Sequence, residues 1–267
     1  MEHQLLSYRQ SEISCFRFGA GAKPVLCFHG YGESGMLFSF LEKYAGETHS
    51  FYAIELPFHG KTLWREDRRF TLVDLDAITR QLFNTAVNYT LMGFSLGGRV
   101  ALDWYEYHST AIDRMVLMAP DGLKVNFWYW LSTQTRMGNN LFKYSMHHPG
   151  WFFSLLKMLN RLKFVNASIF KFVNYYIHDN EARQLLFNRW TTLAGIKPDL
   201  AKIKNLIREN QTPVRLVYGK YDRIILPNRG QKFRKGVEDF CRLDIIDSGH
   251  QVLHENHVKP ILHALLD

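Results

Sequence analysis

The sequence predicts an α/β fold with a mostly parallel central sheet, helices on both faces and one inserted helical segment. Three observations lead to this prediction: short runs rich in Val, Ile and Leu, helical patterns between those runs, and one long interruption of the alternation. With 267 residues, 46% hydrophobic and 22% charged, the chain is long enough for one large folded domain with an insertion. No apolar run approaches the roughly 18 residues that a membrane-spanning helix needs.

Short apolar runs are the strands that the sequence predicts. Such runs are typical of strands that are buried on both faces, as in a parallel sheet. In chain order the expected strands are Ser14–Phe18, Val25–Phe28, Phe51–Glu55, Thr90–Gly93, Met115–Ala119, Val214–Tyr218 and Leu243–Ile246.

Helical patterns lie between and after these strands. Thr71 can cap a helix whose apolar stripe runs from Leu72 to Ala86. A second helix is expected over Gly97–His108, directly after a strand. A third is expected from Val252 to Leu266, with a break or restart at Pro260, because proline lacks the backbone N–H that a helix interior needs.

The alternation stops after Asp121 and resumes near Val214. From Leu123 to His178 there are fourteen aromatic residues, seven Lys or Arg, and no Asp or Glu. This leaves 26 of the 33 basic residues against 25 acidic ones elsewhere, so the net charge of +8 belongs almost wholly to this segment. We expect a core domain over 1–122 and 196–267, and a helical cap over 123–195 that covers the C-terminal edge of the sheet.

The most informative motif is Gly93-Phe94-Ser95-Leu96-Gly97, between a predicted strand and a predicted helix. In this setting the serine projects from a tight, strained turn, and its neighbours must be small to avoid the adjacent strand and helix. Gly98 extends the small residues by one position. The start of the helix also presents N–H groups beside the serine. We therefore predict that Ser95 is a nucleophile.

A serine nucleophile needs a base, and the base needs an acid that orients it. His250 follows a predicted strand near the end of the chain and is the expected base. Asp222, just after the strand Val214–Tyr218, is the expected acid, because the order Ser, Asp, His then fits this type of fold. Asp121 also follows a strand and is the second candidate for the acid. Asp247 is a weaker third candidate, since it suits a turn at a strand end.

The run Phe28-His29-Gly30-Tyr31-Gly32 follows another predicted strand. The backbone N–H groups of Tyr31 and Leu96 are expected to form an oxyanion hole, in which each donor is worth about 3 kcal/mol. His29 is expected to hold the loop rather than to act as a base.

Together these motifs resemble the α/β-hydrolase superfamily, over nearly the whole chain. The resemblance is carried by the His29-Gly30 turn, the Ser95 motif, the Gly219–Asp222 turn, Ser248-Gly249-His250, and the run Glu55-Leu56-Pro57-Phe58-His59-Gly60. The last run is similar to the family's Asp-x-Pro-Gly-His-Gly loop, with Glu at its first position and Phe58 in place of a glycine. The resemblance implies the α/β-hydrolase fold and a reaction that needs no cofactor or metal.

The run Gly93–Leu102 is in addition similar to the menaquinone-pathway synthase and carboxylesterase branches. Similarity to the first of these implies that Arg99 helps to bind a substrate carboxylate. The expected activity is that of a serine esterase, cleaving a carboxylic ester or thioester through an acyl-enzyme. The alternatives are a lyase or C–C bond hydrolase that uses the same residues on an anionic substrate, and a non-catalytic binding protein. Serine at the turn disfavours the branches with an aspartate nucleophile.

The basic, aromatic segment allows three interpretations. It is a lid that lines an acyl pocket, a face that settles on acidic lipid surfaces, or a helical insertion whose aromatics pack on the core. For a pocket, the expected substrate-binding aromatics are Phe94, Trp128 and Trp151. Nucleic-acid binding is not expected, because no docking motif accompanies the charge.

The remaining features favour a cytoplasmic enzyme of undetermined oligomeric state. Three cysteines without a Cys-x-x-Cys pair suit a reducing compartment, and the first residues do not form a secretory signal. His250, His254 and His257 have spacing that suits a metal on a helix face, but one catalytic and two surface histidines is the preferred interpretation.

Overall fold

The computed structural model describes residues 1–84, 87–124, 127–151, 154, 158, 161 and 179–267. The chain divides into two compact units. Unit 1 is Met1–Lys124 with Gly195–Asp267, and unit 2 is Val125–Ala194. The expectation that 123–195 cover the edge of the sheet stays a prediction.

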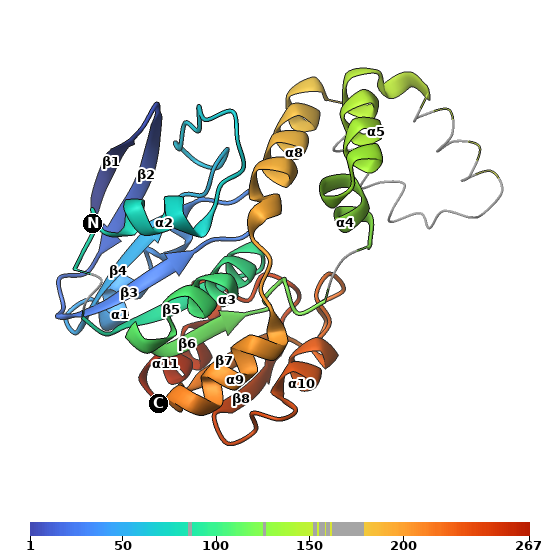
Figure 1. The fold of residues 1–267 in the computed structure, drawn as a ribbon. Helices are drawn as coiled ribbons and strands as arrows, with labels where there is room; N and C mark the ends of the chain where they lie inside the picture. Colours follow the sequence, from blue (N-terminus) through green and yellow to red (C-terminus); the bar gives the residue numbers. More distant parts are fainter. Residues whose placement is uncertain (85–86, 125–126, 152–153, 155–157, 159–160, 162–178) are drawn as a thin grey trace. The chain divides into compact units, whose positions relative to one another are not determined.

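Unit 1 is built on an eight-stranded sheet with the order β1-β2-β4-β3-β5-β6-β7-β8 (Figure 1). The pairs β1–β2 and β2–β4 are antiparallel, and the other pairs are parallel. The predicted mostly parallel sheet is therefore confirmed. The strands are β1 Glu2–Tyr8, β2 Ser11–Phe18, β3 Lys23–Phe28, β4 His49–Ile54, β5 Tyr89–Phe94, β6 Ile112–Met118, β7 Val214–Gly219 and β8 Cys241–Ile246.

Strand β1 was not predicted from the sequence. This strand lies at the edge of the sheet, pairs with β2 and has mostly exposed or half-exposed side chains. An edge strand is stabilised by its ladder of backbone hydrogen bonds and needs no continuous apolar run, so the pattern that predicts buried strands does not detect it.

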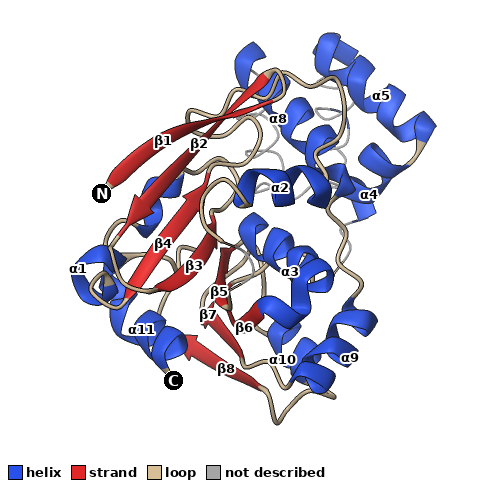
Figure 2. Cartoon of the chain, turned by 60° about the vertical axis from the view of Figure 1, so that its left-hand side comes forward, coloured by secondary structure: helices blue, strands red, loops and turns tan. Residues whose placement is uncertain are grey.

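Helices cover both faces of the sheet, as predicted. Figure 2 shows α1 and α11 on one face and α2, α3 and α9 on the other, in agreement with the α1–α11, α2–α3 and α3–α9 contacts. The helices of unit 1 are α1 Leu41–Ala45, α2 Leu72–Thr79, α3 Leu96–His108, α9 Leu200–Asn210, α10 Asn228–Arg234 and α11 Val258–Leu266. Short 3₁₀ turns lie at Gly35–Phe38, Ser109–Ala111, Leu193–Gly195 and Glu255–His257.

Two predicted helix boundaries are wrong. Thr71 does cap α2, through a capping box with Asp74, but α2 ends at Thr79 and does not include Leu82; Ala86 lies outside the described residues. The last helix does not begin at Val252. It begins at Val258, two residues before the expected break or restart at Pro260, and holds the proline in its first turn, where the missing N–H removes no helical hydrogen bond.

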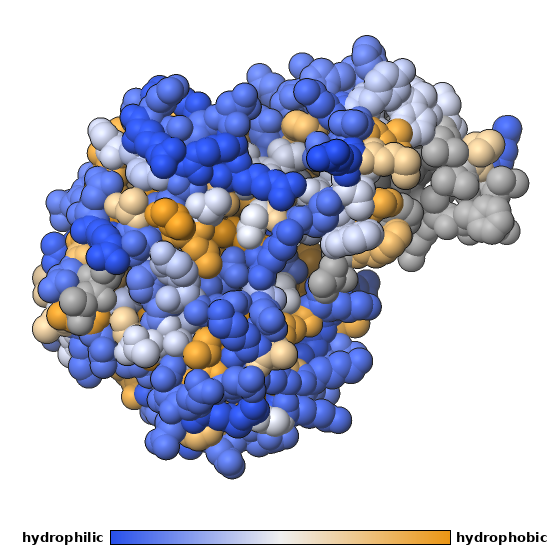
Figure 3. All heavy atoms as spheres, viewed as in Figure 1, coloured by the Kyte–Doolittle hydropathy of each residue, from blue (hydrophilic) through white to orange (hydrophobic). Residues whose placement is uncertain are grey.

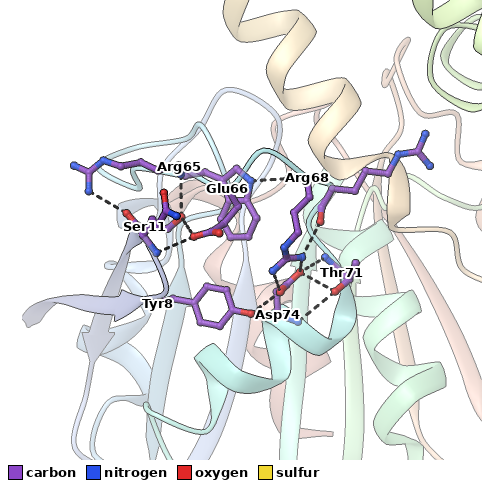
Figure 4. Close-up of polar contacts among 10 residues, drawn as sticks. Tyr8, Ser11, Arg65, Glu66, Arg68, Thr71 and Asp74 are labelled. Atoms are coloured by element: carbon purple, nitrogen blue, oxygen red, sulfur yellow. Dashed lines mark hydrogen bonds and ion pairs between the residues drawn. The ribbon is translucent and has the colours of Figure 1, made fainter.

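A buried ionic network around Asp74 joins the start of α2 to the loop before it and to β1 (Figure 4). The two terminal guanidinium nitrogens of Arg68, Nη1 and Nη2, donate to the Asp74 carboxylate, and the Tyr8 hydroxyl and Thr71 hydroxyl donate to it as well. Burial acts to raise the pKa of Asp74, but these donors outweigh burial and hold the pKa far below its ordinary value. The carboxylate is thus a fixed charge that ties three chain segments together.

Unit 2 is helical where it is described, with α4 Phe127–Gln134, α5 Arg136–His147 and α8 Asn180–Thr192. Its aromatic side chains pack on one another: the Phe142 ring lies 5.4 Å from that of Phe187 and 5.6 Å from that of Trp190. Arg183, which is buried, donates to the Met146 carbonyl at 3.1 Å. Among the helices that the structure describes in either unit, none has the length and apolar character to cross a bilayer.

Candidate active site

Ser95 stands on a strained turn between β5 and α3. Its φ of 50° and ψ of −115° lie in a region that a side chain makes costly, on the order of 1–3 kcal/mol. Two backbone hydrogen bonds hold the turn in this conformation: the Ser95 N–H donates to the Met118 carbonyl at 3.0 Å, and the Ser95 carbonyl accepts from Asp121 N at 2.8 Å. These bonds, to the strand and turn next to β5, hold the strain in place.

The glycines around Ser95 allow the chain to approach its neighbours closely. A Cβ on Gly97 would stand 1.9 Å from the Phe28 carbonyl oxygen, and one on Gly98 would stand 2.4 Å from the Pro120 side chain. A Cβ on Gly93 would lie 2.6 Å from the Gly97 carbonyl oxygen. The small residues that the motif requires are therefore explained by contacts with β3, with the turn after β6 and with the first turn of α3.

His250 lies between Ser95 and Asp222. Its Nε2 is 3.0 Å from the Ser95 Oγ, and its Nδ1 is 2.7 Å from the Asp222 Oδ2. Because an ionised carboxylate only accepts hydrogen bonds, Nδ1 carries the proton and Nε2 is left as the acceptor for the Ser95 hydroxyl. Three side chains that are up to 155 residues apart in sequence thus form one hydrogen-bonded row.

Asp222 is held rigidly at the end of β7. It is 3% exposed, and its Oδ1 accepts from the N–H groups of Ile224 and Ile225 at 2.7 and 2.9 Å. Burial acts to raise the pKa of Asp222, but the hydrogen bond from His250 and the two backbone donors outweigh burial and lower the pKa below its ordinary value. The carboxylate is therefore charged and aimed at His250.

The other two candidate acids have different partners. The Oδ2 of Asp121 lies 3.6 Å from the Nε of Arg99. Asp247 is a hydrogen-bond partner of Tyr221 and thereby raises the pKa of that phenol. Arg99, predicted to bind a substrate carboxylate, has an 11% exposed side chain beside Asp121. Its role toward a substrate stays a prediction.

The turn after β3 is held by His29, which is fully buried. Its Nε2 accepts from the Leu56 N–H at 3.1 Å, and its Nδ1 lies 2.8 Å from the Gly30 carbonyl oxygen. His29 therefore holds the loop, as expected. Tyr31 follows in the same turn, with its ring packed edge-on against His59, and Leu96 is the first residue of α3, directly after Ser95.

The neighbouring loop, Glu55–Gly60, is organised around the Glu55 carboxylate. This carboxylate accepts from the Ser34 hydroxyl, from Gly35 N at 3.2 Å and from Lys61 N at 2.7 Å. Phe58 has a φ of +62°, a conformation that favours glycine, which is the residue of the family's loop at this position. The loop therefore carries local backbone strain at Phe58.

The three aromatic residues predicted to bind substrate differ in how far they are exposed and described. Phe94 is 1% exposed and packs beside His250, with 5.3 Å between ring centres, so it supports the His250 ring and has almost no surface to offer a substrate. Trp151, in unit 2, is 37% exposed and lies 6.5 Å from the Tyr144 ring. The side chain of Trp128 lies outside what the structure describes.

Away from His250, the described histidines and cysteines do not form a metal-binding group or a reactive thiol site. His254 uses its Nδ1 to accept from the Asn256 N–H, and within the described residues no group of three or more His, Cys, Asp or Glu is arranged to hold a metal ion. Cys15, Cys27 and Cys241 are buried free thiols, and burial raises the pKa of Cys241 to about 12, so they are core residues.

The sequence analysis did not single out Glu33, which lies in the turn after Tyr31. Its side chain packs over Gly30 and beside the Phe94 ring. The available signal was an acidic residue three positions after Gly30, in a turn that otherwise carries small and aromatic residues.

A mostly parallel eight-stranded sheet with a serine on a strained strand-to-helix turn defines an α/β-fold hydrolase. The chain belongs to the alpha/beta hydrolase family, which it matches over residues 25–263. The predicted superfamily and fold class are thereby confirmed.

Solved structures agree with this fold. A protein described as a probable hydrolytic enzyme, from Pseudomonas aeruginosa PAO1, has a TM-score of 0.68 at 15% identity, over 100% of this chain and 94% of the other. The thioesterase domain from the curacin biosynthetic pathway has a TM-score of 0.66 at 15% identity, over 99% of both chains. A thermophilic esterase from Thermogutta terrifontis has a TM-score of 0.66 at 14% identity, over 98% and 97%. No curated protein matches the chain. At these identities the likeness shows the fold alone.

Proposed function

We propose that this protein is a serine hydrolase that cleaves a carboxylic ester or thioester through an acyl-enzyme. One observation carries the proposal: His250 bridges Ser95 and Asp222, with hydrogen-bond distances of 3.0 and 2.7 Å. A serine within reach of a base that is itself oriented by a buried carboxylate is the arrangement that activates a hydroxyl for attack.

In the first half of the reaction, the Ser95 Oγ attacks the carbonyl carbon and its proton passes to the His250 Nε2. The backbone N–H groups of Tyr31 and Leu96 donate hydrogen bonds to the carbonyl oxygen and stabilise the negative charge that develops on it. The intermediate collapses, the bond to the leaving group breaks, and His250 returns the proton to the departing oxygen or sulfur. The acyl group remains on Ser95.

In the second half, a water molecule takes the place of the leaving group. His250 accepts its proton, the hydroxide oxygen bonds to the acyl carbon, and collapse releases the carboxylic acid while Ser95 regains its proton. Asp222 stays ionised throughout, and its charge stabilises the imidazolium that forms in both halves. The low pKa of Asp222 suits that role.

A fluorophosphonate probe tests the proposal, because such probes phosphonylate only an activated serine. We expect labelling of the folded wild type and loss of labelling in Ser95→Ala. Ser154→Ala, which removes an exposed hydroxyl in unit 2, is the matched control and should label normally. If the folded wild type does not label and does not hydrolyse p-nitrophenyl esters, the protein is not a serine hydrolase.

A further inference from the structure

Helix α5 of unit 2 presents a line of large apolar side chains to the solvent. Met137, Leu141 and Tyr144 are 79%, 52% and 56% exposed. Their spacing of four and three residues places them on one side of the helix, one above the other. A different side of α5 packs within unit 2, where the Phe142 ring contacts α8 and Met146 is buried. The exposed apolar line is therefore additional to the stripe that holds α5 in place.

Basic side chains lie beside this apolar line. Arg136 and Lys143 are both exposed, and their spacing of seven residues places them two turns apart along one side of α5, next to the apolar line. The stretch Leu123–His178, which contains α5, has seven Lys or Arg and no Asp or Glu. The positive charge beside the apolar line is thus not neutralised by any acidic residue of this stretch.

Helix α4 packs against α5 within unit 2 and adds two exposed aromatic rings (Figure 1). Phe127 and Trp130 are three residues apart, with 6.2 Å between ring centres. Trp and Tyr, which combine an apolar ring with a polar N–H or O–H group, are enriched at the boundary between water and lipid. Lys and Arg beside them can lay their apolar stems along such a surface and keep their charge in water.

We propose that the exposed face of α4 and α5 binds the surface of a membrane that contains anionic lipid. Its apolar and aromatic side chains enter the boundary between headgroups and acyl chains, and its cations meet the acidic headgroups. A lipid surface satisfies both features at once, whereas a small anion would engage the cations alone. The inference goes beyond the proposed function and does not depend on the reactivity of Ser95.

The test is co-sedimentation of the whole chain with vesicles of phosphatidylcholine alone, or of phosphatidylcholine and phosphatidylglycerol in equal parts. We expect binding to the mixed vesicles to exceed binding to the neutral ones at least tenfold, because two or more cations face the anionic surface. Raising the ionic strength from about 0.1 M to about 1 M shortens the screening length from about 10 Å to about 3 Å and should remove most of this preference.

Substitutions in α5 locate the binding face. Leu141→Ala should weaken binding to the mixed vesicles about tenfold, because it removes apolar surface that lipid would cover. Leu5→Ala, which truncates a similarly exposed leucine on β1 of unit 1, is the matched control and should bind as the wild type does. Lys143→Glu should weaken binding at least fivefold. Its control is Lys232→Glu, which reverses an exposed charge on α10 of unit 1.

Wild type that does not sediment with the mixed vesicles, or that sediments equally with neutral ones, overturns the inference. Equal losses in Leu141→Ala and Leu5→Ala also overturn it, because binding would then not use α5. If circular dichroism shows that Leu141→Ala does not fold, Tyr144→Ala is the second variant. Ser95→Ala should sediment as the wild type does, so failure of the proposed function leaves this inference standing. A fluorophosphonate-labelled wild type that does not sediment defeats this inference alone.

Discussion

Unit 1 and unit 2 differ in where they hold their carboxylates and their apolar side chains. Unit 1 buries acidic side chains and gives them partners, as at Glu55, Asp74 and Asp222. In unit 2 the described acids, Asp179 and Glu181, are exposed at the start of α8. Both units expose some large apolar side chains, but in unit 2 they are concentrated in a short stretch that includes Phe127, Trp130, Met137, Leu141 and Tyr144.

The difference separates two requirements of an enzyme. A reaction centre needs charges that keep their position while bonds change, and buried, hydrogen-bonded carboxylates provide them. Exposed apolar side chains suit contact with apolar partners. On the face drawn in Figure 3, hydrophilic side chains cover most of unit 1, with hydrophobic ones in small groups between them. We therefore expect the chemistry to depend on unit 1 and the choice of acyl group to depend on unit 2.

The largest effect is expected from Asp222→Asn. An amide cannot balance the imidazolium and favours the wrong tautomer of His250, so kcat should fall about 10⁴-fold. The matched control is Asp121→Asn, which removes the negative charge beside Arg99 and should change kcat only a few-fold. Steady-state kinetics with a p-nitrophenyl ester checks both variants. If Asp121→Asn is the inactive one, the assigned acid is wrong.

The same substitution in each unit tests how closely the backbone is packed. Gly97→Ala would place a Cβ 1.9 Å from the backbone oxygen of Phe28, and we expect a loss of about 3 kcal/mol or more in the free energy of unfolding. At Gly150, in unit 2, no atom of the described residues lies within 4 Å of such a Cβ, so Gly150→Ala should change stability by less than about 1 kcal/mol. Urea unfolding followed by circular dichroism measures both changes. Equal losses of unfolding free energy in Gly97→Ala and Gly150→Ala would contradict the expected difference in backbone packing between the two units.

The buried Asp103 is expected to make the free energy of unfolding depend on pH. It is 6% exposed, its Oδ2 accepts from Lys197 N at 2.9 Å, and burial raises its pKa to about 6 from an ordinary value of 3.8. Because the folded pKa is the higher one, its contribution to stability is full below pH 3.8 and is lost as the pH rises through about 6.

Asp103→Asn keeps an acceptor for the Lys197 N–H and removes the buried charge. The variant should therefore be more stable than wild type at pH 7.5, by on the order of 2 kcal/mol, with the gain vanishing near pH 4. The difference between the two proteins in urea unfolding isolates Asp103, since the other carboxylates titrate in both. A gain that is the same at both pH values would rule out the buried charge as its cause.

The smallest effect is expected from Trp151→Ala in unit 2. If this exposed ring contacts the acyl chain, its loss should raise KM for long-chain esters about tenfold, or about 1.4 kcal/mol, and leave acetate esters unchanged. Tyr107→Ala, which removes an exposed ring from unit 1, is the matched control. Both variants are assayed with esters of increasing acyl-chain length. Equal changes in KM for short and long esters in Trp151→Ala would show that Trp151 does not bind the acyl chain.

Much of unit 1 could be predicted because its signals are local. A strand buried on both faces needs consecutive apolar residues, so β3, β5 and β7 appear directly in the sequence, whereas the edge strand β1 does not. The turn at Ser95 needs small neighbours within four residues, and it too is visible in the chain. The boundaries of α2 and α11 depend on capping and on packing, and they were less well predicted.

The sequence by itself determined the resemblance to the family, the strands β2 to β8 in chain order, the helices α2, α3 and α11, and the three residues Ser95, Asp222 and His250 as candidates. Tertiary structure alone decided which carboxylates meet which cations: Asp222 lies against His250, Asp121 beside Arg99, and Glu33 beside the turn that follows β3. It also decided that Phe94 is buried. The physical reason is distance: backbone conformation responds to nearby residues, whereas charge pairing and burial depend on atoms that only folding brings within a few ångströms of one another.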